Sequence, residues 1–113
     1  MQHDPRKYLY DIAEAARLIQ DFTRSKRLDD YKNDMLLQSA VERQFQIIGE
    51  ALLQLFKRFP EMADKISQNR SIIDFRHILV HGYDQIDSEI VWGIIEARLP
   101  VLLSEVDSLL NIF

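Results

Sequence analysis

Apolar residues recur every three to four positions along most of the chain, and no segment alternates with a period of two, so the pattern predicts helices and no strands. The first helix is expected to open at Asp4, an N-cap residue followed by Pro5 at the first helical position. Its apolar stripe ends near the basic run "RSKR", residues 24–27, where positive side chains suit a helix C-terminus.

The second predicted helix is the longest, and it runs from Asp29 or Asp30 to Phe59, where Pro60 ends it. Its apolar positions cover about half of the helix circumference, more than one neighbouring helix needs. We expect either a central place in a bundle or a face turned toward a second subunit. Gly49 inside this helix costs about 1 kcal/mol relative to alanine, which indicates the close approach of another backbone. The opposite face is polar and carries Glu42, Arg43, Gln46 and Glu50.

The remainder of the chain predicts shorter pieces. Residues 61–68 form a short helix or turn, and a third main helix begins near Arg70 or Ser71. The last helix has Asp87 or Ser88 as N-cap and continues to the C-terminus, with a kink at Pro100 because proline removes one backbone hydrogen bond. We therefore expect an all-α fold, an up-and-down bundle of four to five helices, with residues 1–113 as a single domain.

Composition narrows the classes of function. The net charge is −4, so a broadly basic nucleic-acid-binding surface is excluded and any contact with phosphate needs a local patch. The chain has no cysteine, which excludes disulfides and thiolate metal sites and fits a cytoplasmic protein. No uncharged apolar stretch approaches about 20 residues, so we expect no membrane span.

The densest group of chemically active side chains is the stretch "FRHILVHGYDQID", residues 75–87. On a regular helix Arg76 and His81 would point about 140° apart and could not share one small site. His77 and His81 would share a face with Asp74, a spacing that zinc sites also use. Surface stripes of this kind are common without metal, and we predict no metal site here.

A different arrangement follows if the helix loosens at Gly82, because the last turn could then turn His81 toward Arg76. Arginine offers a permanently charged fork to phosphate, and histidine exchanges protons near neutral pH. RNA carries its own nucleophile in the ribose 2′-hydroxyl, so these two groups suffice for cleavage without a metal. The same side chains could instead cap the helix or pair with Asp74 or Asp84, and spacing alone leaves both interpretations open.

The segment "RHILVHGYDQID" resembles the Arg-x4-His-x-Tyr signature of HEPN-domain proteins, in the form found in the HepT-like toxins of HepT–MntA toxin–antitoxin pairs. Two further segments resemble the second and the last helix of that family, in the same order: "AVERQFQIIGEAL" (residues 40–52) and "DSEIVWGIIEARLPVLLSEV" (residues 87–106). The resemblance covers nearly the whole chain.

This resemblance implies a HEPN-like five-helix bundle that forms a homodimer, with the active clefts at the subunit interface. It implies a metal-independent RNase that needs no cofactor and acts on an RNA substrate. Arg76 would stabilise the phosphate charge and His81 would be the acid and base, supported by His77, Asp84 and Arg43.

The same resemblance implies a regulatory partner. Tyr83 matches the tyrosine to which an MntA-like nucleotidyltransferase antitoxin adds AMP, and the adduct would silence the toxin. An alternative within the same superfamily is a non-catalytic subunit that binds substrate or nucleotide for a two-component nucleotidyltransferase.

Overall fold

The structure, a computed structural model, describes residues 4–67, 69–82 and 86–112. Within these residues every regular element is a helix, which confirms the all-α prediction. In chain order the elements are α1 (Pro5–Thr23), α2 (Leu28–Lys32), α3 (Met35–Arg58), the 3-10 helix η1 (Pro60–Lys65), α4 (Asn69–His81), α5 (Ser88–Ala97) and α6 (Leu99–Ile112). The side chains of Asp4 and Asp87 cap α1 and α5 as the sequence predicts, since each accepts a backbone N–H of the first turn.

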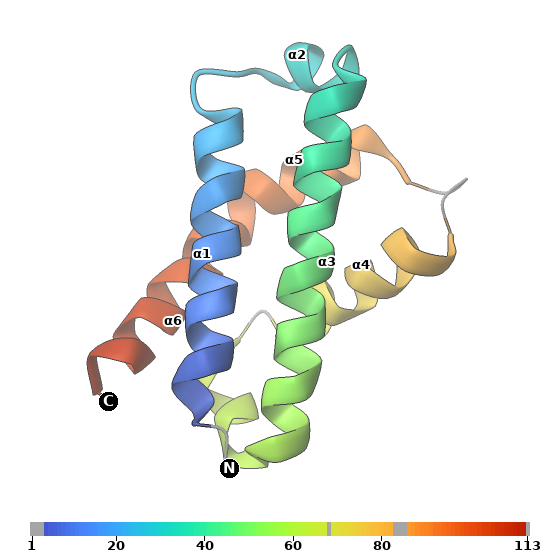
Figure 1. Ribbon diagram of the computed structural model, residues 1–113. Coiled ribbons are helices and arrows are strands. Elements are labelled where there is room, and N and C mark those ends of the chain that lie inside the picture. The colour runs from blue at the N-terminus through green and yellow to red at the C-terminus, as the bar shows by residue number, and fades with distance from the viewer. Residues whose placement is uncertain (1–3, 68, 83–85, 113) are drawn as a thin grey trace.

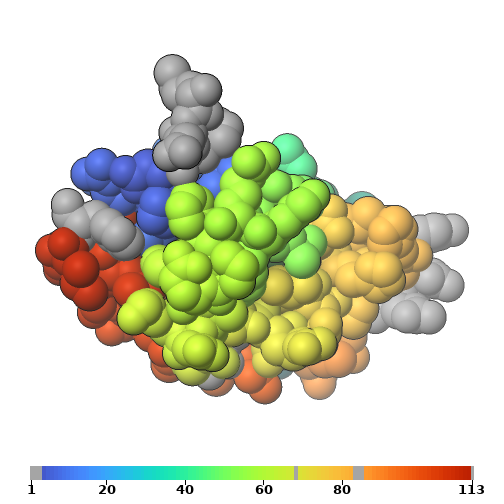
Figure 2. Space-filling view, turned by 90° about the horizontal axis from the view of Figure 1, so that it is seen from below, coloured from blue at the N-terminus to red at the C-terminus, as the bar shows by residue number. Residues whose placement is uncertain are grey.

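Helices α1 and α3 lie side by side and antiparallel, and they form the centre of the molecule (Figure 1). Helix α6 packs on α1, and α4 packs on α3. Seen from below, the C-terminal end of α3 and η1 lie between α1 and α6 on one side and α4 on the other (Figure 2). The core between them is aliphatic and aromatic, and its fully buried side chains include Leu9, Ile12, Ile19, Phe45, Ile48, Leu52, Leu55, Ile72, Leu99 and Leu102.

The prediction of one helix from Asp29 or Asp30 to Phe59 is wrong, because the helix is interrupted between α2 and α3. Asp34 starts α3 as its N-cap, and its Oδ1 accepts a hydrogen bond from the Leu37 N–H at 3.0 Å. The side-chain amide of Gln38 donates to the carbonyls of Tyr31 and Lys32, at 2.8 and 3.1 Å. A side chain of α3 therefore binds the carbonyl groups that the C-terminal end of α2 leaves without a helical partner.

The kink predicted at Pro100 is instead a break at Arg98, which separates α5 from α6. Pro100 is the second residue of α6 and therefore lies in the first turn, where a helix does not need the missing N–H. Arg98 belongs to the hydrogen bonding of both helices. Its N–H donates to Ile94 O at the end of α5, and its carbonyl accepts from Leu102 N at the start of α6, both at 3.0 Å.

The wide apolar face of α3 is covered inside the chain. Helix α3 packs against α1, α4, α2 and η1, so its central place accounts for the breadth of that face. The homodimer stays a prediction, since the face does not by itself require a second subunit. Among the described residues, no helix is both long and apolar enough to cross a membrane.

Candidate active site

Arg76 is placed by a close approach of α4 to α3 at Gly49. A Cβ atom added to Gly49 would overlap Arg76 Cβ and lie 2.5 Å from Arg76 Cγ, well inside van der Waals contact. Only glycine lets the stem of the arginine lie directly on the α3 backbone. Gly49 does mark a close approach, but the approaching group is the side chain of Arg76 and not the second backbone that the sequence predicted.

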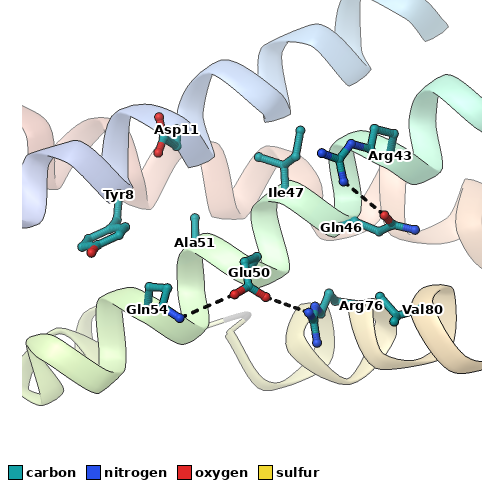
Figure 3. A pocket seen from close by; sticks show the side chains of 10 residues that line it. All are labelled: Tyr8, Asp11, Arg43, Gln46, Ile47, Glu50, Ala51, Gln54, Arg76 and Val80. Carbon is teal, nitrogen blue, oxygen red and sulfur yellow. Dashed lines mark hydrogen bonds and ion pairs between the residues drawn. The ribbon is translucent and has the colours of Figure 1, made fainter.

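The charged end of Arg76 is held by Glu50, the next residue of α3. Arg76 Nη2 donates to Glu50 Oε2 at 2.7 Å, and Gln54 Nε2 donates to Glu50 Oε1 at 3.5 Å (Figure 3). The Arg76 side chain is 25% exposed, and its buried Nε has no hydrogen-bond partner within the described residues. Glu50 thus fixes one corner of the guanidinium and leaves donor capacity for another anion.

A pocket of about 360 Å³ opens beside this pair, between α1, α3 and α4. Arg43 lines it together with Arg76, so the structure brings these two predicted site residues into one cavity. Arg43 Nη1 donates to Gln46 Oε1 at 3.4 Å. The other lining residues are Tyr8, Asp11, Gln46, Ile47, Glu50, Ala51, Gln54 and Val80.

His81 does not line this pocket. Helix α4 stays regular to its end, and the hydrogen bond from Gly82 N to Ile78 O, at 2.8 Å, continues the helical pattern past His81. Of the two arrangements that the sequence left open, the described residues show the regular helix and not the loosened last turn. Arg76 and His81 remain on different faces of α4, as a straight helix requires.

His77 and His81 do share a face, as the regular helix predicts. Their ring centroids lie 4.7 Å apart with an interplanar angle of 52°, and both side chains are exposed. In the described part of the chain, Asp74 does not join them in a cluster with the geometry of a metal site. Tyr83 and Asp84 lie outside the described residues, so their predicted roles stay predictions.

Sequence patterns did not single out several of the residues that form the pocket. Glu50 was visible only as the last member of the polar strip Glu42–Gln46–Glu50, and one more step of four residues along α3 leads to Gln54. Tyr8 and Asp11 come from α1, far away in the sequence, and no local signal connects them with Arg76.

Glu42, at the other end of the strip Glu42–Gln46–Glu50, is partly buried. Burial raises the pKa of Glu42 above its usual range. Burial likewise raises the pKa of Tyr31, with a further contribution from the negative charge of Glu42. The Tyr31 hydroxyl has no hydrogen-bond partner within the described residues, and its ring packs against Trp92 with centroids 5.5 Å apart.

Comparison with known proteins identifies the class. The model of the family described as ribonuclease HepT-like matches residues 12–109. A protein of Thermococcus cleftensis named as a probable ribonuclease HepT is 33% identical over 109 residues, which cover 96% of this chain and 98% of that protein. No solved structure matches the chain.

Two relatives from Methanocaldococcus jannaschii carry provisional RNase names. One is 30% identical over 94% of this chain and 96% of its own length. The other, whose name adds gamma-glutamylcyclotransferase, is 33% identical over 94% of this chain, and this chain spans about half of it, 47%.

The fold is an all-α HEPN bundle. The family match and the named relative support an endoribonuclease. The chain belongs to the HepT-like ribonuclease family.

Proposed function

We propose that this protein cleaves RNA without a metal ion, with Arg76 as the phosphate-binding charge and His81 as the acid and base. The observation that carries the proposal is the constrained guanidinium of Arg76, which rests on Gly49, is oriented by Glu50 and shares a pocket with Arg43. An arginine fixed in this way is organised in advance for a phosphodiester, so its charge acts where negative charge develops during the reaction.

The reaction uses a nucleophile that RNA itself supplies. A histidine removes the proton of the ribose 2′-hydroxyl, and O2′ attacks the adjacent phosphorus. The bond from phosphorus to the 5′-oxygen of the next nucleotide breaks, and that oxygen takes up a proton. The products are a 2′,3′-cyclic phosphate and a free 5′-hydroxyl. Arg76 stabilises the extra negative charge on the phosphoryl oxygens between these two stages.

The geometry of α4 favours a site shared by two subunits. Arg76 and His81 leave the regular helix on different faces, and His81 is exposed to solvent. In a two-fold symmetric dimer the partner subunit's His81 can approach Arg76, and the reverse pair forms at the same time. His77, whose ring lies beside that of His81 at a tilt, would orient the catalytic imidazole or accept a proton from it.

RNA cleavage by the purified protein in the presence of a chelator tests the proposal. Arg76→Ala and His81→Ala should each lower the cleavage rate by about 10²- to 10⁴-fold. Arg76→Lys keeps the charge but loses the planar fork, so it should recover only part of the rate. Arg70→Ala, at an exposed position of the same helix, is the matched control. Cleavage that persists in both alanine variants would falsify the assignment of these residues.

We further propose that the enzyme acts as a cytoplasmic toxin silenced by an antitoxin of the nucleotidyltransferase class, which adds AMP to Tyr83. Tyr83 lies two residues beyond His81 in the sequence, so a bulky anionic adduct there would repel the phosphates of RNA. The intact mass of protein coexpressed with such a nucleotidyltransferase tests this. Added AMP masses should appear on the wild-type chain and be absent from Tyr83→Phe, and an unmodified wild-type chain would contradict it.

A further inference from the structure

We infer that the pocket beside Arg76 is a nucleotide subsite, which holds the nucleotide attached to the phosphate bound by Arg76 and prefers a base with an exocyclic amino group. This inference rests on the proposed function, because it assumes that Arg76 binds phosphate. The preference for certain bases is new, since it follows neither from the roles of Arg76 and His81 nor from the family match.

The size and the apolar part of the pocket suit one nucleotide. Its volume of about 360 Å³ lies at the lower end of the range for small-ligand sites. Ile47 and Ala51 give it an apolar wall on α3, and Tyr8 lies on α1, across α3 from Arg76 (Figure 3). A flat base can pack on such a wall while its polar edge stays available for hydrogen bonds.

The charges of the pocket favour a single phosphodiester. Arg76 and Arg43 supply two positive charges, which the carboxylates of Glu50 and Asp11 offset, and Glu50 takes one hydrogen-bonding position of Arg76. The carboxylate of Glu50 beside the arginine repels any additional negative charge, so a di- or triphosphate fits poorly. A phosphodiester carries one negative charge, and the remaining donors of Arg76 match it.

The end of the pocket away from Arg76 offers acceptors. Asp11 lies on α1, and as an ionised carboxylate it can only accept hydrogen bonds. Its present partner is the exposed Lys7, at 3.3 Å, a surface ion pair of little strength that a ligand can displace. Adenine, cytosine and guanine each carry an amino group that can donate to Asp11. Uracil has a carbonyl oxygen where cytosine has its amino group, and its one base N–H, at N3, lies between two carbonyl oxygens that repel a carboxylate, so uracil pairs less well with Asp11.

A chimeric oligonucleotide isolates this specificity. A deoxyribonucleotide strand with one central ribonucleotide has a single cleavable bond, and the base of that ribonucleotide can be adenine, cytosine, guanine or uracil. We expect kcat/KM for the three amino-bearing bases to exceed that for uracil by about 10-fold, the effect of one hydrogen bond to a charged group. Asp11→Asn should reduce the difference to about 2-fold, because an amide can also donate to the uracil carbonyl.

Glu14→Gln is the matched control, since Glu14 is an exposed carboxylate of the same helix that does not line this pocket. It should leave the base preference unchanged. Equal kcat/KM for all four bases in the wild-type enzyme overturns the inference, and so does a preference that survives Asp11→Asn.

Binding of the all-deoxy oligonucleotide separates this inference from the proposed function, because that strand lacks the attacking hydroxyl. Tighter binding of the amino-bearing strands that depends on Asp11 supports the subsite even if no RNA is cleaved. Cleavage that depends on Arg76 and His81, without any base preference in binding or in rate, overturns the subsite alone.

Competition by AMP, CMP and UMP then assigns the source of the nucleotide. Displacement of the oligonucleotide only at concentrations far above its own Kd assigns the subsite to RNA. If AMP binds as tightly as the oligonucleotide and with the same dependence on Asp11, the subsite stands and its occupant is a free nucleoside monophosphate.

Discussion

Gly49 and Arg76 are in direct contact, and there is no room for a β-carbon between the α3 backbone and the arginine stem. The consequence is mechanical. The position of the guanidinium of Arg76 depends on a residue that carries no side chain, and Glu50, the next residue along, binds this guanidinium at 2.7 Å. Two consecutive residues of α3 therefore set both the depth and the direction of Arg76.

Gly49→Ala should destabilise the fold by about 1–3 kcal/mol, because the new methyl group forces α4 away from α3 in a packed contact. RNA cleavage should fall as well, since Arg76 moves with α4. Urea unfolding and steady-state cleavage measure the two effects. Gly93→Ala is the control, because a Cβ there meets nothing within 4 Å, and it should stabilise the fold by up to about 1 kcal/mol. Equal effects of the two substitutions would contradict the role of Gly49.

Substitutions of Glu50 should separate the effect of its negative charge on RNA binding from its orientation of the Arg76 guanidinium. Glu50→Gln keeps an acceptor for the guanidinium but removes the charge, so KM for RNA should fall by about 3-fold at low salt. Glu50→Ala removes the acceptor, and the less constrained arginine should lower kcat by about 10-fold. Steady-state kinetics of both variants, with Glu96→Gln on the exposed surface of α5 as control, test this. The expectation fails if Glu50→Ala has the kinetics of the wild-type enzyme.

Mixed dimers should reveal whether Arg76 and His81 of one site come from different subunits. We expect the Arg76→Ala and His81→Ala proteins to be nearly inactive alone, whereas a mixed dimer would hold one intact site and one doubly defective site. An equal mixture, refolded together, should recover about a quarter of the wild-type activity, because half of the dimers are mixed and each has one site of two. If the two residues act within one chain, the mixture stays inactive.

Glu42→Gln should stabilise the protein at neutral pH and have little effect in acid. Burial raises the pKa of Glu42 in the folded state, so the folded protein holds its proton more tightly than the unfolded chain. That contribution to stability is present below the unfolded pKa, near 4.5, and is lost as the pH rises through the folded pKa. Urea unfolding at pH 4 and pH 7 checks the sign. Glu14→Gln, an exposed carboxylate, should show no comparable pH dependence.

The sequence predicted those parts of the fold that depend on local chemistry. Asp4 and Asp87 were recognisable as N-caps, and Gly49 was recognisable as a point of close approach. The break between α2 and α3 was missed because the apolar spacing continues across Asn33 and Asp34, and the deciding contacts are side-chain bonds from Asp34 and Gln38. Periodicity does not record such bonds.

The candidate site was predictable only in part, for a similar reason. Arg76 and Arg43 were identified from their motif and their helix face, and they line one pocket. Tyr8 and Asp11 reach the same pocket only because α1 packs against α3, a tertiary contact without a local signature. The opposite directions of Arg76 and His81 did follow from helical geometry alone, and the regular end of α4 retains them.

The contact at Gly49 has a genetic consequence. On the proposed toxin function, a screen for bacteria that survive expression of the enzyme would recover loss-of-function mutations, and not all of them would fall on groups that touch RNA. Any single-base change that gives residue 49 a side chain should displace Arg76 and allow the cells to grow. Glycine codons mutate to several such residues, so position 49 should be a frequent site of escape even though it takes no part in the chemistry.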